Sequence, residues 1–362
     1  MPALYAHDRF GREVSGRLDG ELRELIEKYD RQYQIGLQGP DIFFFYGAHT
    51  NNKVVRFGEH LHQVSAYPFF RHAVKVIQET GRDSGEYAYL LGFLCHFVLD
   101  SECHPYVEEM IQETGVQHLE IEAEFEKLLL RLDGRDPVAF PLDTLVPTDE
   151  ETARSIQPFY PVKMREPEAV ERLKDRLKEQ RKDWQLRDSQ IAGVSRARRR
   201  FRKKSAWAEE EVQGVEYDLD AEESREFGMD RNPEESGKQG VSRNFVENKD
   251  PGECENTGRR YLTVATIRRS LKDLRAIKKF LTAPQPLKQD MINTVMKLAG
   301  VYPQLNGVML QRFDNPNCAE SNAGLKLRYD ASVEIALRMI ACLDESVRTG
   351  ARLPERFDRT FS

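Results

Sequence analysis

Histidine is missing from the last two thirds of this 362-residue sequence, and all eight histidines lie between His7 and His118. The sequence also has no CxxC cysteine pair, no glycine-rich phosphate-binding loop and no internal repeat. Thiolate pairs for a metal, a nucleotide-binding loop and a repeat architecture are therefore not indicated. The five cysteines are expected to be buried thiols of a protein in a reducing cytoplasm.

Long apolar runs are also scarce. The longest run, from Tyr87 to Leu99, is too short to span a bilayer and contains a histidine. The first residues, MPALYAHDRF, do not combine a basic region with a following apolar region, as a secretory signal would. We therefore expect a cytoplasmic protein without a transmembrane segment.

The charge is unevenly distributed along the chain. Residues 1–150 contain 14 Lys and Arg against 26 Asp and Glu, a net charge of −12, whereas the remaining residues contain 40 against 34, a net charge of +6. An acidic first part that also holds all the histidines suits bound cations better than nucleic acid.

Helical spacing of apolar residues dominates, and strand patterns are scarce, so the sequence predicts an all-α fold. Asn51 or Asn52 could cap a helix that runs through Leu61, and 66–77 is expected to be another helix. Residues 83–100 are apolar on nearly every face and predict a buried helix, which is expected to stop at His104-Pro105. A further long helix follows Gly115.

Three regions are expected. Residues 1–160 form a metal-binding helical domain, 161–257 form a charged insertion, and 258–362 form helices that pack on the first domain. The insertion includes a charged helical run over 168–184 and the basic run RARRRFRKK at 196–204. It is expected to be largely disordered from about residue 208, because a segment poor in aliphatic residues cannot offset its ordering entropy.

Two histidine–carboxylate pairs carry the chemistry. His96 and Asp100 are four residues apart, as are His118 and Glu122, so each pair shares one helix face. His104 lies between the pairs. Imidazole and carboxylate are ligands that zinc accepts when thiolates are absent, and two adjacent helices could place them around one cleft. A single pair of this kind would more often be a structural hydrogen bond, but two pairs and a third histidine within 27 residues favour metal binding.

The segments HFVLDSECHPYV and HLEIEAEF resemble the zinc-dependent phospholipase C family, which includes bacterial phosphatidylcholine-cleaving enzymes. GLQGPDIFFFYG at 36–47 is similar to the family's GPD segment, and GEHLH at 58–62 is similar to its Gly-x-x-x-His helix. The resemblance is close over roughly residues 1–130 and implies an all-α domain with up to three zinc ions in one cleft.

The resemblance also implies which residues bind each ion. The first ion would be bound by Asp41, His62, His96 and Asp100, the second by His104, His118 and Glu122, and the third by Asp100, His7 and the N-terminal amine. His60 is the alternative to His62. Secreted members begin with a tryptophan that binds the third ion. Here removal of the initial methionine would expose the amine of Pro2, which would bind the third ion in place of the tryptophan. His49 and His72 are expected to have no metal role.

The implied activity is hydrolysis of a phosphodiester by a metal-activated water. Asp41 would ligate zinc and also accept the proton of the attacking water as catalytic residue. The substrate would be a phospholipid or another phosphate ester, with a peripheral membrane contact. Residues 43–46 (FFFY) could line a lipid site or belong to the core.

Three other functions compete with this one. A three-zinc single-strand nuclease would use a similar site, but the acidic first domain argues against a nucleic acid substrate. An HD-domain phosphohydrolase needs an adjacent His-Asp pair inside a helix, and the one such pair is His7-Asp8 near the start. A non-catalytic, metal-stabilised interaction module could present the last helices as its surface. The oligomeric state is left open by the sequence.

Overall fold

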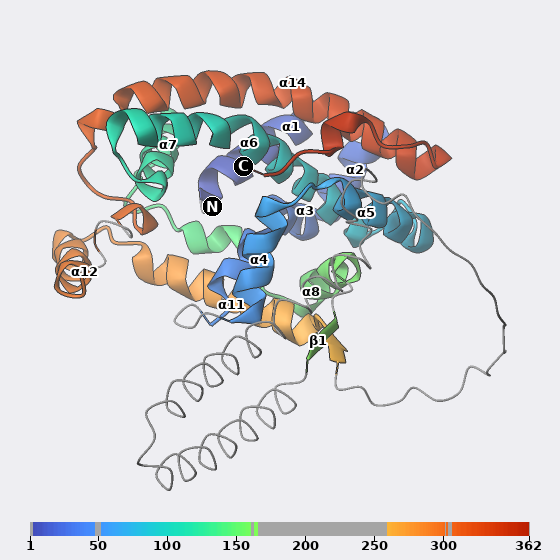
Figure 1. Ribbon diagram of the computed structural model, residues 1–362, viewed down its shortest axis with the longest axis horizontal. Helices are drawn as coiled ribbons and strands as arrows, with labels where there is room; N and C mark the ends of the chain where they lie inside the picture. The colour runs from blue at the N-terminus through green and yellow to red at the C-terminus, as the bar shows by residue number, and fades with distance from the viewer. Residues whose placement is uncertain are drawn as a thin grey trace, which may run out of the picture. The chain divides into compact units, whose positions relative to one another are not determined.

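The structure is a computed structural model that describes residues 3–47, 52–160, 163–165, 259–300, 302 and 306–361 (Figure 1). The chain divides into two compact units. Met1–Tyr160 and Thr263–Ser362 form one, called here the helical unit, and Pro161–Leu262 forms the other.

In the second unit, the described residues form two short antiparallel strands, β1 (Lys163–Arg165) and β2 (Arg259–Tyr261), with Lys163 opposite Tyr261. The predicted charged helix at 168–184, the basic run and the predicted disorder from about residue 208 lie outside the described residues.

The helical unit confirms the predicted all-α class. Its α-helices are α1 (Leu4–Gly16), α2 (Gly20–Lys28), α3 (Asp30–Gly36), α4 (Lys53–Gln63), α5 (Tyr67–Thr80), α6 (Gly85–Thr114), α7 (His118–Leu132), α8 (Glu150–Ile156), α11 (Val264–Leu281), α12 (Pro286–Leu298) and α14 (Ala319–Thr349). Short 3₁₀ helices connect them: η1 (Gly39–Phe45), η2 (Leu142–Leu145), η3 (Gln157–Phe159), η4 (Asn306–Val308), η5 (Pro316–Cys318) and η6 (Glu355–Phe357).

Helix α6 is the centre of this unit. Ser84 caps its start by accepting a hydrogen bond from the Tyr87 amide, and Gly115, with φ of 72°, ends it in the left-handed conformation. Its first half is buried on every face, as its apolar composition predicts. The prediction that this helix stops at His104-Pro105 is wrong. The helix continues to Thr114.

Proline inside a helix removes one backbone hydrogen bond, but here tertiary packing compensates. Cys103, Val107 and Met110, on either side of Pro105, are all buried, so apolar burial holds the flanking turns in place. The continuous helix keeps His96, Asp100 and His104 at successive four-residue steps on one face.

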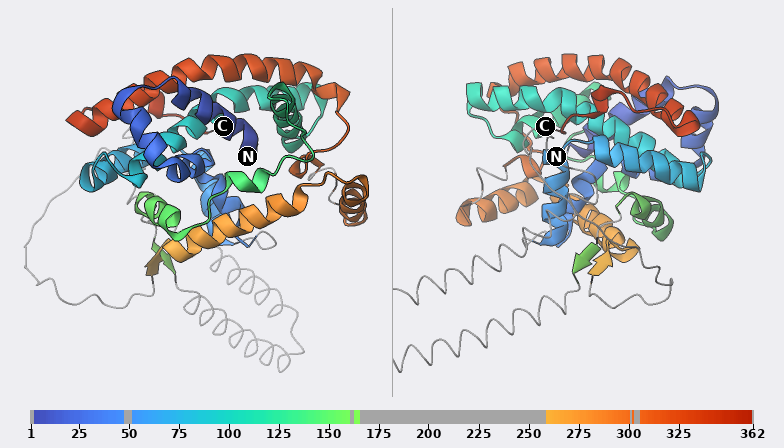
Figure 2. Two further views of the ribbon diagram at one scale, coloured as in Figure 1. Left: turned by 180° about the vertical axis from the view of Figure 1, so that it is seen from behind. Right: turned by 45° about the vertical axis from the view of Figure 1, so that its right-hand side comes forward.

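Other helices pack around α6 at close range. Helix α3 approaches through Gly36 and Gly92, where a Cβ atom on Gly36 would overlap the carbonyl oxygen of Tyr89. Helix α14 runs along α6 and α7 in all views (Figure 1 and Figure 2). The helices after residue 258 are thus part of the same packed unit as the histidine-rich helices.

Two further sequence expectations concern local features. Asn52 caps α4, since its side chain accepts hydrogen bonds from the amides of Val54 and Val55. Four cysteines, Cys95, Cys103, Cys318 and Cys342, are free thiols, and the first three are buried. Across the described part of the chain, no helix is both long and apolar enough to cross a bilayer.

Candidate metal centre

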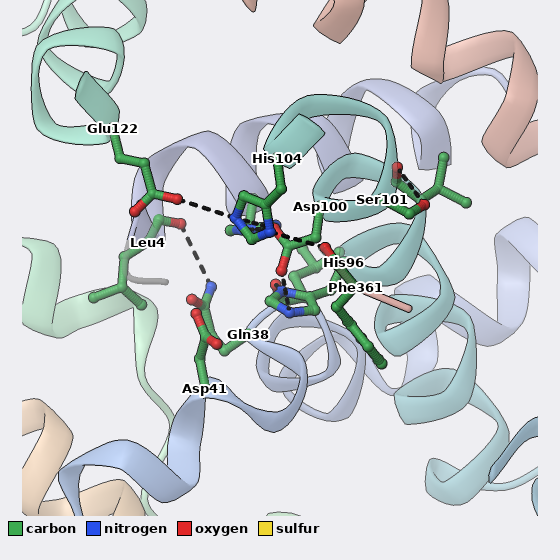
Figure 3. Close-up of polar contacts among 12 residues, drawn as sticks. Leu4, Gln38, Asp41, His96, Asp100, Ser101, His104, Glu122 and Phe361 are labelled. Atoms are coloured by element: carbon green, nitrogen blue, oxygen red, sulfur yellow. Dashed lines mark hydrogen bonds and ion pairs between the residues drawn. The ribbon is translucent and has the colours of Figure 1, made fainter. Parts of the chain in front are cut away.

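Five segments of the helical unit bring the predicted residues together. The loop that contains η1 supplies Asp41, and helices α1, α4, α6 and α7 supply the others: His7 from α1, His62 from α4, His96, Asp100 and His104 from α6, and His118 and Glu122 from α7. Figure 3 shows Asp41, His96, Asp100, His104 and Glu122 pointing toward one another. The residues form three groups, and within each group the ligand atoms lie within 4.8 Å of one another. The first two groups share His96, and Asp100 Oδ1, 3.8 Å from His104 Nε2, links the first group to the third.

The first group is His7, His96 and Asp100. The two carboxylate oxygens of Asp100 face different histidines, with Oδ1 3.2 Å from His7 Nε2 and Oδ2 3.1 Å from His96 Nε2. The imidazole rings of His7 and His96 stack at 4.3 Å between centroids. Asp100 is therefore placed to bridge two binding positions.

The second group is Asp41, His62 and His96. Asp41 Oδ1 lies 2.9 Å from His62 Nε2. Gly39 allows this approach because its φ is +49° and a Cβ atom there would overlap the His96 ring. The glycine of the GPD segment thus lets η1 pass directly beside α6.

The third group is His104, His118 and Glu122. Glu122 Oε1 lies 3.2 Å from His104 Nε2 and 3.1 Å from His118 Nε2. His104 and Glu122 are buried, whereas the His118 side chain is 32% exposed. This end of the centre is open to solvent at His118.

The other ring nitrogen of each histidine in the second and third groups has its own acceptor. His62 Nδ1 is 2.7 Å from Gly58 O, His96 Nδ1 is 3.2 Å from Leu37 O, and His104 Nδ1 is 2.8 Å from Phe361 O. His118 Nδ1 faces Glu108 at 3.3 Å. A carbonyl oxygen accepts only from a protonated nitrogen, so Nε2 is left with its lone pair, as is typical of metal-binding histidines.

The histidine nitrogens and carboxylate oxygens that face the inside of the centre are better placed to bind a metal ion than to hydrogen-bond to one another. His62 Nε2, His96 Nε2 and Asp100 Oδ2 are buried and make no well-directed hydrogen bond, although they lie close to other members of their groups. A buried polar atom that makes no hydrogen bond lowers the stability of the folded protein. A shared cation would satisfy them, and a set of imidazole and carboxylate donors suits zinc.

The surroundings of the three carboxylates favour their ionised form. Burial alone would raise the pKa of Asp41 and Asp100. The positive charge of the N-terminal amine and the contact with His62 lower the pKa of Asp41, and protonated His96 and His104 lower that of Asp100. The pKa of Glu122 is likewise lowered, against the effect of burial, by the positive charge of the N-terminal amine and by its contacts with His104 and His118. Ionised carboxylates are the form that binds a cation.

The other histidines named in the sequence analysis lie outside the three groups or outside the described residues. His60 is in none of the three groups, so the geometry of the second group favours His62 over the alternative. His72 Nε2 instead lies 3.0 Å from Pro158 O, away from the three groups. His49 and the amine of Pro2 lie outside the described residues.

The aromatic residues after Asp41 divide between core and site. Phe43 is fully buried and packs against Phe57 and Tyr160, so it belongs to the core. Phe44 is half-buried and lies 5.0 Å from the His62 ring. Phe44 is therefore the aromatic residue of this segment that lies against the site.

Phe361 is a site residue that the sequence did not indicate. Its ring is buried and lies 5.2 Å from the His62 ring and 5.8 Å from the His96 ring, and its carbonyl oxygen faces His104 (Figure 3). The segment after α14 is held nearby by the bond from the Ala66 amide to the Arg359 carbonyl. A backbone acceptor 257 residues away from His104 has no sequence signal.

Removing Phe361 and Ser362 is expected to weaken zinc binding by about tenfold, because His104 would lose the acceptor that fixes its tautomer. Competition with a chromogenic chelator would measure this affinity. Phe159→Ala is the control, since Phe159 is fully buried but packs against Phe69 and Tyr89. Equal zinc affinity in the truncated and full-length proteins would contradict this role for Phe361.

Comparison with known proteins agrees with this geometry. The model of the family described as zinc-dependent phospholipase C matches residues 6–186, half of the 362-residue chain. Neither the search of curated proteins nor the search of solved structures returned a match. The matched range contains every residue of the three groups. The chain therefore belongs to the zinc-dependent phospholipase C family.

Proposed function

We propose that this protein hydrolyses a phosphodiester, with a phospholipid as substrate, using zinc held by the three groups. The observation that carries the proposal is the closeness of the groups: His96 belongs to two of them, and Asp100 faces His7 and His96 and, at 3.8 Å, His104 of the third. Adjacent groups of this kind would suit a cluster of cations that binds a single phosphate.

Bound zinc would neutralise the charge that develops on the phosphate and would lower the pKa of a water molecule. The side chains of the protein would orient the ligands and transfer protons. We propose that Asp41, which lies 2.9 Å from His62 and has a lowered pKa that favours its ionised form, accepts the proton of the attacking water. Asp100 and Glu122 would hold the histidines and cations in one arrangement.

Substrate would enter at His118, and its apolar part would lie against Phe44. His118 is the member of the third group that is partly open to solvent, and Phe44 is half-buried beside His62. An apolar ring next to a cationic centre suits a molecule with a phosphate and an apolar part. A diacylglycerol-like alcohol is the leaving group we propose.

The proposal is tested by metal analysis of the purified protein together with a hydrolysis screen. We expect at least two zinc ions per chain and release of phosphocholine or a related headgroup from phospholipid. Fewer than two zinc ions would refute the centre. Zinc without hydrolysis of any phosphate ester would support an interaction module, and cleavage of single-stranded DNA alone would support a nuclease.

Asp41→Asn is expected to lower the turnover number by at least about a hundredfold, because the amide cannot accept the water proton. Initial-rate kinetics with and without added zinc would measure it. Asp8→Asn is the matched control, since Asp8 is also buried but pairs with Arg12 at 2.8 Å outside the three groups. Full activity in Asp41→Asn would remove Asp41 from the mechanism.

A further inference from the structure

Helix α12 exposes a stripe of large apolar side chains. Leu287, Met291, Val295 and Leu298 are 80%, 55%, 61% and 84% exposed. They are separated by steps of four, four and three residues, so they lie on one face of the helix. Large apolar side chains exposed in a continuous row indicate an interaction surface.

The opposite face of α12 is the one that packs on the helical unit. Ile292 belongs to a buried cluster with Ala283 and Met309. Gln289 fixes the helix on this face, donating to the Leu310 carbonyl at 3.0 Å and accepting from the Arg312 amide at 3.1 Å. The exposed stripe is therefore an additional apolar face and is not needed to attach the helix.

The segment that carries the stripe is rich in Lys and Arg. Residues 264–298, which include α11 and α12, contain eight Lys and Arg against two Asp, a net charge of +6. In α11, Arg268, Arg269 and Arg275 pair with acidic side chains and Lys278 is buried. In α12, Lys288 and Lys297 lie on the two flanks of the stripe, with Asp290 on the same flank as Lys297. This charge contrasts with the −12 of residues 1–150. An apolar row bordered by lysines is typical of helices that lie in the interface of an anionic bilayer.

The stripe is also linked to the open end of the metal centre. The chain after α12 reaches η4, where a Cβ atom on Gly307 would overlap the backbone of Leu119, the residue after His118. Asn315 then donates to Glu120 of the same helix at 2.9 Å. Figure 2 shows α11 and α12, in orange, following one another along one side of this unit.

We propose that the exposed stripe of α12 and its lysines dock on the surface of an anionic phospholipid bilayer. Docking would bring the open end of the centre at His118 near the headgroups that it is proposed to cleave, and in this respect the inference rests on the proposed function. The apolar side chains enter the headgroup region, and the lysines bind lipid phosphates.

The experiment compares vesicles of phosphatidylcholine with vesicles that also contain phosphatidylglycerol. Co-sedimentation of the full chain should show binding to the anionic vesicles that weakens at high salt. The triple variant Leu287→Ser, Val295→Ser, Leu298→Ser should bind about tenfold or more weakly. The matched control is Leu132→Ser with Leu327→Ser, two side chains that are 57% and 72% exposed on α7 and α14.

The triple variant is expected to keep its zinc content and its hydrolysis of a short-chain, water-soluble phospholipid, because none of its positions lies in the three groups. Equal vesicle binding by the triple variant and the control would overturn the proposal, as would failure of the wild-type protein to bind. A wild-type dimer that the triple variant dissociates would instead assign the stripe to a second copy of the chain. Vesicle binding without hydrolysis would refute the proposed function alone.

Discussion

Replacing Asp100 with asparagine is expected to remove at least one zinc ion per chain and to reduce phosphodiester hydrolysis by more than about a hundredfold. The reason is the position of this carboxylate. Its two oxygens face His7 and His96 separately, and Oδ1 is also 3.8 Å from His104. Asparagine has one oxygen and no negative charge, so it can serve only one of these positions.

Metal content by mass spectrometry and initial-rate kinetics would measure the two effects of Asp100→Asn. Asp344→Asn is a suitable control, because Asp344 binds Arg82 at 2.8 Å and Tyr87 at 2.7 Å far from the three groups. The control is expected to lower thermal stability without changing the zinc content. An Asp100→Asn protein with a full complement of zinc would show that this carboxylate does not bridge the ions.

Gly39→Ala is expected to lower the free energy of unfolding by about 2–5 kcal/mol and to weaken zinc binding. Alanine at the φ of +49° costs about 1 kcal/mol by itself. The larger part comes from the overlap of its Cβ atom with the His96 ring, which must separate η1 from α6. Asp41 and His96 would then move apart.

Gly20→Ala is the matched control for this prediction. Gly20 has a similar φ of +56°, but no atom lies within 4 Å of the position of a Cβ atom there. The Gly20→Ala protein is expected to lose only about 1 kcal/mol of unfolding free energy and to keep the zinc affinity of the wild-type protein. Denaturant unfolding and chelator competition would measure both variants. Equal effects of the two substitutions would attribute the loss to backbone strain and not to the contact with His96.

The local sequence predicted much of the candidate centre. The four-residue spacing of His96 and Asp100, and of His118 and Glu122, depends on helix geometry alone, so each pair could be placed on one face before any packing was known. The cap at Asn52 and the buried character of α6 also depend on local composition. The resemblance of the GPD segment added Asp41, which no helix period would connect to His62.

The prediction that α6 ends at His104 is wrong because the end of this helix depends on tertiary packing and not on the local sequence. Local rules treat Pro105 as a helix stop, because proline lacks an amide hydrogen. Burial of Cys103, Val107 and Met110 outweighs this local cost. Local propensity is a weak preference, and packing energy can override it.

The helical class, the histidine–carboxylate pairs and the kind of cation that they suit could be predicted from the amino-acid sequence, because they follow from residue chemistry and helix spacing. Tertiary packing placed His62, and not His60, beside Asp41 and His96, brought the carbonyl oxygen of Phe361 to His104, and left the apolar stripe of α12 uncovered. These features join residues far apart in the chain or depend on what covers a surface. Both are set by packing, which the spacing of residues along a sequence does not record.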